Sequence, residues 1–171
     1  MKKMLLIIIL GILMGIYVNS RDYVSLPSTS IRMRVIAASN SDADQKIKYE
    51  VKSIFENIVY RLIKKAKNSE DVDNLIIENN EKIKLLMKEE MGQKGIFDDF
   101  TLNYGYNYFP QKEFKGVVYP SGEYKSYVVT IGEGKGENWW CVMYPPLCLI
   151  DENNEEYEYQ SLINTILEKY N

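Results

Sequence analysis

The sequence predicts an α+β domain with a mostly antiparallel sheet of four to five strands, packed with an N-proximal helical hairpin and a C-terminal helix. Three observations support this prediction. An alternating segment comes early, two long segments of helical periodicity follow it, and the second half of the chain turns to a strand-like composition rich in Tyr, Phe, Val and Thr. The length of 171 residues fits one domain preceded by a leader.

The leader has the layout of a secretory signal peptide. Lys2 and Lys3 precede an uncharged apolar run from Met4 to Val18, and polar residues follow. The run is short for a membrane span, which needs about 20 residues, but its cleavage signal is imperfect. Both a removed signal peptide and an uncleaved membrane anchor therefore stay open. The expected organisation is a leader at 1–20, a linker at 21–30 and a single domain at 31–171.

The first half of the domain predicts one strand and two helices. Residues 31–37 alternate apolar and charged side chains, which is typical of a strand with one buried face. Apolar residues then recur at spacings of three and four from Ile47 to Ile63, after candidate N-caps at 39–42, and again from Val72 to Met87. A short turn near Asn68 joins the two expected helices into a hairpin.

The second half predicts strands and a last helix. The turn signature Pro-Ser-Gly at 120–122 separates two of the strands, and Leu162, Ile163, Ile166 and Leu167 have helical spacing. Strands are expected at 100–109, 114–119, 124–131 and 139–144, and the helix at 155–170.

Composition excludes several kinds of chemistry. The chain has no histidine, which removes the commonest general base and metal ligand. Ser121 with Lys125 formally offers a Ser–Lys dyad, but a turn serine and an exposed strand lysine are the favoured interpretation. The net charge of −3 becomes −5 when Lys2 and Lys3 leave with residues 1–20, so no nucleic-acid partner is expected. No cofactor or metal site is expected either.

The most unusual segment is residues 132–151, which holds both tryptophans and both cysteines of the chain. Its glycine-rich start lacks the Walker spacing and leads into a strand, so it is interpreted either as a bulged loop or as a loop shaped to contact another protein. Cys141 and Cys148 flank a proline pair. They form either a disulfide, as an oxidising compartment would allow, or two buried thiols.

This segment resembles the stage II sporulation protein R family. The family has a Pro-x-Gly-x-Tyr turn, present here at 120–124, then Gly-Glu-Gly-x-Gly-x-Asn-Trp-Trp-Cys-Val, present at 132–142, and then Pro-Pro-Leu-Cys at 145–148. Residues 31–37 resemble its first strand, whereas Ala38 and Asn40 depart from its pattern. The resemblance covers about residues 31–151.

The resemblance implies a signalling protein of endospore-forming bacteria that is exported from the forespore into the intermembrane space. There it would activate a membrane-embedded aspartic protease that processes a mother-cell sigma-factor precursor, so the chain itself would not be an enzyme. An uncleaved leader would add membrane contact. A carboxylate-dependent exported hydrolase and a structural envelope protein are the alternatives. The expected partner-binding residues are Gly134, Lys135, Trp139 and Trp140, although one tryptophan would also suit the core.

Overall fold

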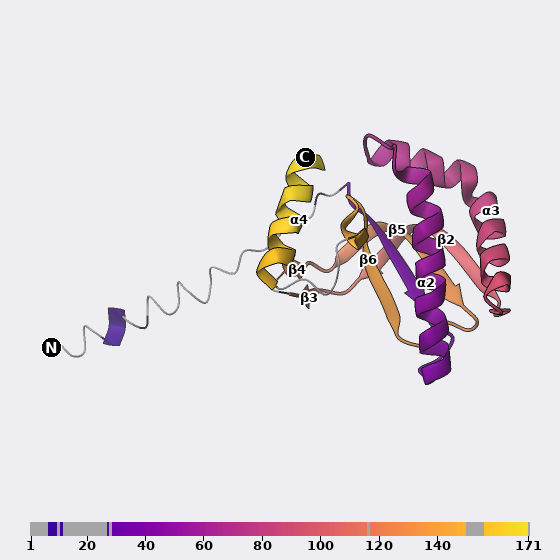
Figure 1. The fold of residues 1–171 in the computed structure, drawn as a ribbon. Coiled ribbons are helices and arrows are strands. Elements are labelled where there is room, and N and C mark those ends of the chain that lie inside the picture. The colour runs from indigo at the N-terminus through magenta and orange to yellow at the C-terminus, as the bar shows by residue number, and fades with distance from the viewer. Residues whose placement is uncertain are drawn as a thin grey trace.

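A computed structural model describes residues 7–9, 11, 27, 29–115, 117–149 and 156–170, with the side chains described up to Cys148 and again from Leu162. The elements in chain order are β1 (Ile31–Ile36), α2 (Asp42–Ile63), α3 (Ser69–Gln93), β2 (Phe100–Phe109), β3 (Lys112–Phe114), β4 (Val117–Tyr119), β5 (Gly122–Ile131), β6 (Asn138–Tyr144), the 3₁₀ turn η1 (Leu147–Leu149) and α4 (Glu156–Tyr170) (Figure 1). The leader at 1–20, the linker at 21–30 and Asp151 lie largely or wholly outside the described residues. No helix in the described part of the chain is long and apolar enough to cross a membrane.

The main sheet has the strand order β2-β5-β1-β6. Strands β2 and β5 are antiparallel, as are β1 and β6, whereas β1 and β5 run parallel. The predicted α+β fold with a mostly antiparallel sheet is therefore confirmed. Strand β1 lies inside the sheet, and β6 occupies one edge.

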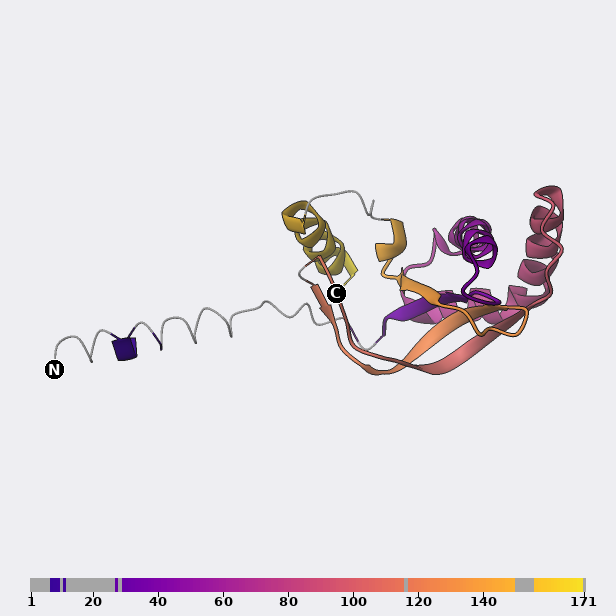
Figure 2. The same cartoon turned by 90° about the horizontal axis from the view of Figure 1, so that it is seen from below.

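Helices α2 and α3 lie on one side of this sheet (Figure 2). The register pairs Met33 with Tyr127 and Val35 with Val129, and these buried residues share a cluster with both helices. We call this cluster the helix-side core. At its centre the rings of Phe55 and Tyr127 meet edge to face with centroids 4.9 Å apart, an arrangement that aromatic pairs favour.

A second, smaller cluster lies on the other face of β6. It combines β4, β6, η1 and α4 through six buried residues, and we call it the edge cluster: Val117, Tyr119, Val142, Leu147, Ile163 and Leu167. Trp140 packs against it. Both views place α4 beside the β3–β4 hairpin (Figures 1 and 2).

The helix starts follow ordinary capping chemistry. The Ser41 hydroxyl accepts a hydrogen bond from the Asp44 amide at 3.1 Å, and the Asn68 side chain accepts one from the Asp71 amide at 2.8 Å. Asn68, expected near the end of the first helix, is therefore the cap of the second.

The strand expected at 114–119 is wrong as a single element. It is divided into β3 and β4, which pair with each other in a separate antiparallel sheet. Lys115 between them has a φ of 47°, a left-handed conformation that a continuous strand does not adopt. The resulting hairpin turns Phe114 and Tyr119 toward β6 and so provides one side of the candidate site.

Candidate functional site

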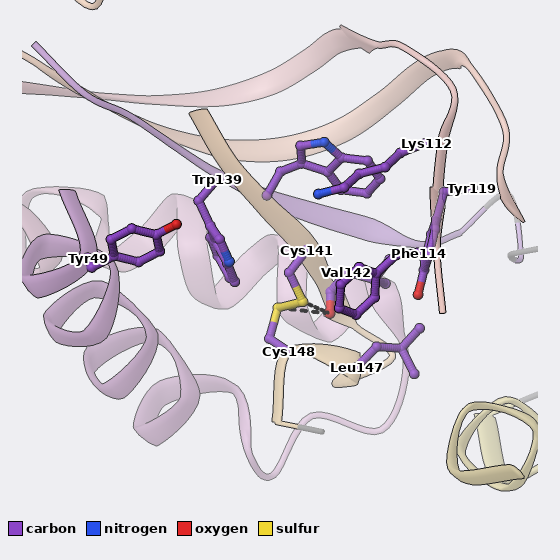
Figure 3. A pocket seen from close by; sticks show the side chains of 10 residues that line it. Tyr49, Lys112, Phe114, Tyr119, Trp139, Cys141, Val142, Leu147 and Cys148 are labelled. Carbon is purple, nitrogen blue, oxygen red and sulfur yellow. Dashed lines mark hydrogen bonds between the residues drawn. A yellow bond between two sulfur atoms is a disulfide. The ribbon is translucent and has the colours of Figure 1, made fainter. Parts of the chain in front are cut away.

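The candidate site is a pocket of about 210 Å³ that straddles the edge strand β6. We call it the aromatic pocket. Trp139 and Tyr49 of α2 form one side, the disulfide crosses the middle, and Phe114, Tyr119 and Lys112 form the other side (Figure 3). The ten lining residues are Tyr49, Lys112, Phe114, Tyr119, Trp139, Trp140, Cys141, Val142, Leu147 and Cys148.

The two tryptophans reach this pocket from opposite faces of β6, as consecutive strand residues must. Trp139 packs partly on the helix-side core, with Lys52 Nζ 4.6 Å from its ring centroid. Trp140 packs on the edge cluster, where the ring centroids of Phe109 and Tyr119 each lie 5.5 Å from its own. Both indoles are half-buried. Each tryptophan is thus partly core and partly pocket wall.

Cys141 and Cys148 form a disulfide, with Cα atoms 5.5 Å apart. Cys141 belongs to β6 and Cys148 to η1, so the bond holds the 3₁₀ turn against the strand. The turn places Leu147, which is 3% exposed, in the edge cluster. Of the two states left open for these cysteines, the structure has the disulfide.

The glycine loop at 132–137 is fixed to the connection between β1 and α2. The amide of Gly136 donates to the Ala37 carbonyl at 2.9 Å, and that of Lys135 donates to the Ala38 carbonyl at 3.1 Å. The Glu137 amide donates to Asn40 Oδ1 at 2.6 Å. The loop is therefore a well-bonded support for the start of β6.

The glycines in this loop serve close packing. Gly134 has a φ of +63°, and a Cβ there would collide with the Thr130 methyl group. A Cβ on Gly136 would collide with the Ser39 carbonyl oxygen. Both positions therefore need glycine for the loop to meet the sheet and its neighbouring loop.

Lys135 projects from the loop into solvent and pairs with Glu133 at 2.6 Å, both side chains being 74% exposed. It does not line the aromatic pocket. Of the four expected partner-binding residues, the structure thus brings Trp139 and Trp140 together in one pocket, while Gly134 and Lys135 lie in the loop before it.

Behind Trp140 lies Arg32 of β1, which is fully buried. Its guanidinium carbon is 3.4 Å from the Tyr124 ring centroid, 4.9 Å from that of Trp140 and 5.0 Å from that of Phe109. Its Nη2 donates to the Pro120 carbonyl at 3.4 Å, and its Nε and Nη1 have no hydrogen-bond partner. The guanidinium is held by aromatic faces, which attract cations.

The burial of Arg32 affects the pKa of its guanidinium group. Loss of solvent lowers this pKa to about 10, because burial penalises the charged form. Burial also lowers the pKa of Arg34, whose Nη2 donates to the Tyr108 carbonyl at 2.8 Å. Arg32 and Arg34 together place two positive charges on the Trp140 side of β6, although the chain as a whole has a negative net charge.

Sequence reasoning singled out the segment that holds Trp139 to Cys148 but missed the pocket residues that come from elsewhere in the chain. Alternation at 31–37 indicated that Arg32 and Arg34 would lie on an exposed face, whereas aromatic rings from β2, β5 and β6 cover that face. Tyr49 was not singled out within the first expected helix, and Lys112 was in no predicted element. Nothing in the local sequence signals their meeting, since it depends on the β3–β4 turn and the sheet order. The Lys125 ammonium bonds to Asp73, which agrees with the favoured interpretation that Ser121 and Lys125 do not form a catalytic dyad.

No group of three or more His, Cys, Asp and Glu side chains within the described ranges is arranged to hold a metal ion. The aromatic pocket combines aromatic surface, a positive charge and the edge of strand β6, and these features are suited to binding.

Comparisons with known proteins identify the family to which the chain is similar. The family model described as Stage II sporulation protein R matches residues 27–154. The Stage II sporulation protein R of Bacillus subtilis (strain 168) is 35% identical over 133 residues, which cover 78% of this chain and 59% of that protein. The chain thus spans less than two thirds of the length of this relative. No solved structure gives a significant match.

Proposed function

The chain belongs to the stage II sporulation protein R family, and on that premise we propose that it is an exported sporulation signal that activates a membrane-embedded aspartic protease. The protease would then cleave the precursor of a mother-cell sigma factor. The role in sporulation follows from the family. The export, the protease and the precursor belong to the proposal.

The observation that carries the proposal is the aromatic pocket. The family's Trp-Trp-Cys segment forms its wall, and a separate hairpin and helix complete it. Aromatic side chains that are open to solvent are typical of protein-binding surfaces. A ligand activates a protease only by binding the active arrangement better than the inactive one, so an open, structurally supported surface is what this role requires.

The proposed location is the space between forespore and mother cell. The leader supports it, since residues 2–18 combine a basic start with an apolar run. Membrane contact through residues 1–20 belongs to the same proposal in the case of an uncleaved leader. The disulfide is compatible with an oxidising compartment.

The test is reconstitution in a non-sporulating host. The full chain is co-expressed with the candidate protease and the sigma-factor precursor, and cleavage is followed by immunoblot. We expect cleavage only when the chain is present and the protease has its catalytic aspartates. Cleavage by the chain without the protease, or no cleavage by both together, would contradict the proposal.

The interface residues are tested in the same system. Trp139→Ala and Lys135→Ala, each in folded and exported protein, are expected to reduce cleavage. Unchanged cleavage in both variants would remove the glycine loop and the Trp139 side of the pocket from the interface.

A further inference from the structure

Strand β6 presents an open edge beside the aromatic pocket. It pairs with β1 on one side only, and within the described residues no strand pairs with its other side. The Ala37 amide donates to the Glu137 carbonyl, so these two residues form a hydrogen-bonded pair of the ladder between β1 and β6. Hydrogen-bonded and non-hydrogen-bonded pairs alternate in an antiparallel ladder, so the next pair along, Ile36–Asn138, and the third along, Arg34–Trp140, are non-hydrogen-bonded pairs. The backbone N–H and C=O groups of Asn138 and Trp140 therefore face the open edge.

The other end of this edge is covered. The Val142 carbonyl oxygen lies 3.1 Å from Sγ of Cys148, so η1 and the disulfide occupy the space beyond it (Figure 3). The open segment therefore runs from Asn138 to Cys141, next to the pocket. An added strand would be short, and its side chains would alternate between the two sides of the pocket.

Those two sides differ chemically. Lys112 is the only charged residue among the ten that line the pocket, and its Nζ lies 5.3 Å from the Trp140 ring centroid. Arg32, with two unsatisfied guanidinium nitrogens, lies behind the same ring. On the other side of β6, Trp139 and Tyr49 offer aromatic surface. The two lysine ammonium groups that lie over these rings already have partners, since Lys52 pairs with Glu56 at 2.9 Å and the buried Lys48 donates to Gln45 Oε1 at 2.5 Å. One side thus favours a carboxylate, and the other favours an apolar side chain.

We propose that the edge of β6 binds an extended acidic segment of the partner protein, which adds as a strand and places a carboxylate beside Lys112. This rests on the proposed function and names the binding mode. Main-chain hydrogen bonds to Asn138 and Trp140 supply affinity, and the pocket selects for alternate side chains, as in other cases of strand addition. Charge complementarity with Lys112 and Arg32 decides between acidic and neutral segments.

The experiment uses the purified full chain and three capped octapeptides. The first alternates valine and glutamate, the second alternates valine and glutamine, and the third is the glutamate peptide with alternate amides N-methylated. Binding is measured by the fluorescence of the two tryptophans, and amide hydrogen exchange reports on Asn138 and Trp140.

We expect the glutamate peptide to bind and to protect both amides. The glutamine peptide should bind about tenfold more weakly, the effect of losing one charge-assisted hydrogen bond, and the N-methylated peptide should not protect the amides. Lys112→Gln should lower affinity for the glutamate peptide alone. Lys88→Gln on α3, at the far end of the sheet beside Phe100 of β2, should change nothing.

Absence of binding, equal binding of glutamate and glutamine peptides, or unchanged binding of the N-methylated peptide would each overturn the proposal. A concentration-dependent dimer that Asn138→Pro abolishes would assign the edge to a second copy and overturn it as well. Cleavage in the co-expression system is independent of these peptides. Wild-type activation without peptide selectivity would therefore refute strand addition and leave the proposed function intact.

Discussion

The two faces of β6 belong to regions of very different size. Toward the helices, Trp139 joins a core built from α2, α3 and the sheet, which has 19 buried residues among those that the structure describes. Toward the β3–β4 hairpin, Trp140 joins the edge cluster of six, supported by a disulfide and four short or terminal elements. The region around the edge cluster contains Lys112, most of the residues that line the aromatic pocket, and Trp140, whose ring covers Arg32.

The difference in size between the two clusters suggests that the larger one mainly provides stability and the smaller one mainly shapes the binding surface. Burial of apolar area dominates stability, so the helix-side core determines whether the domain folds. The edge cluster adds less area and instead fixes the shape of the pocket. Substitutions in the two regions are therefore expected to differ in size and in what they change.

The largest effect is expected in the helix-side core. Phe55→Ala removes a fully buried ring that packs against Tyr127, and such a change costs about 3–5 kcal/mol of unfolding free energy. Urea unfolding should show a single transition shifted to lower concentration. A loss below about 1 kcal/mol would mean that this core is not the main source of stability.

The next effect separates the two regions. Replacing both Cys141 and Cys148 by serine removes the cross-link that closes an eight-residue loop. The gain in loop entropy of the unfolded state should lower the free energy of unfolding by about 2.5 kcal/mol. Hydrogen exchange should rise in β3, β4 and the end of β6 while α2 stays protected. A uniform rise across α2 would show that the two regions unfold as one unit.

A smaller effect is expected in the glycine loop. Gly134→Ala forces a positive φ on a residue with a Cβ that collides with Thr130, at a cost of about 1–2 kcal/mol. Gly92→Ala in α3 is the matched control, because a Cβ there meets nothing within 4 Å, and helix propensity predicts a gain of up to about 1 kcal/mol. Equal effects of the two changes in thermal unfolding would contradict the packing role of Gly134.

The helix-side core should also lose stability in alkali, with an effect below about 1 kcal/mol between pH 9 and 10.5. Burial raises the pKa of Tyr127 above 10, so its contribution to stability is present below pH 10 and is lost as the tyrosine of the unfolded state ionises above that pH. In urea titrations, Tyr127→Phe should therefore flatten the alkaline loss of stability. An equally steep loss in Tyr127→Phe would show that this phenol is solvated.

Local sequence patterns predicted the elements well where one physical signal dominated. Periodicity of 3.6 residues predicted α2 and α3, and alternation predicted β1 and β2, because each element buries one face. The division between β3 and β4 was missed, since it depends on the left-handed φ of Lys115, a residue type that rarely adopts it.

The part of the site that the sequence predicted is the part built from residue types that are rare in this chain, tryptophan and cysteine. The Trp-Trp-Cys segment stood out by composition, and it does form a wall of the pocket. The burial of Arg32 was not predictable from alternation, because three aromatic rings from separate strands enclose it. Lys112 and Tyr49 reach the pocket through tertiary packing that no local pattern records.

The most direct test compares Lys112→Glu with Lys88→Glu in the co-expression system, with circular dichroism showing that both variants fold. Both substitutions make the same change of charge on an exposed lysine, one at the aromatic pocket and one on α3. The account predicts that precursor cleavage falls by about tenfold or more for Lys112→Glu and is unchanged for Lys88→Glu. Equal cleavage by the two variants would contradict it.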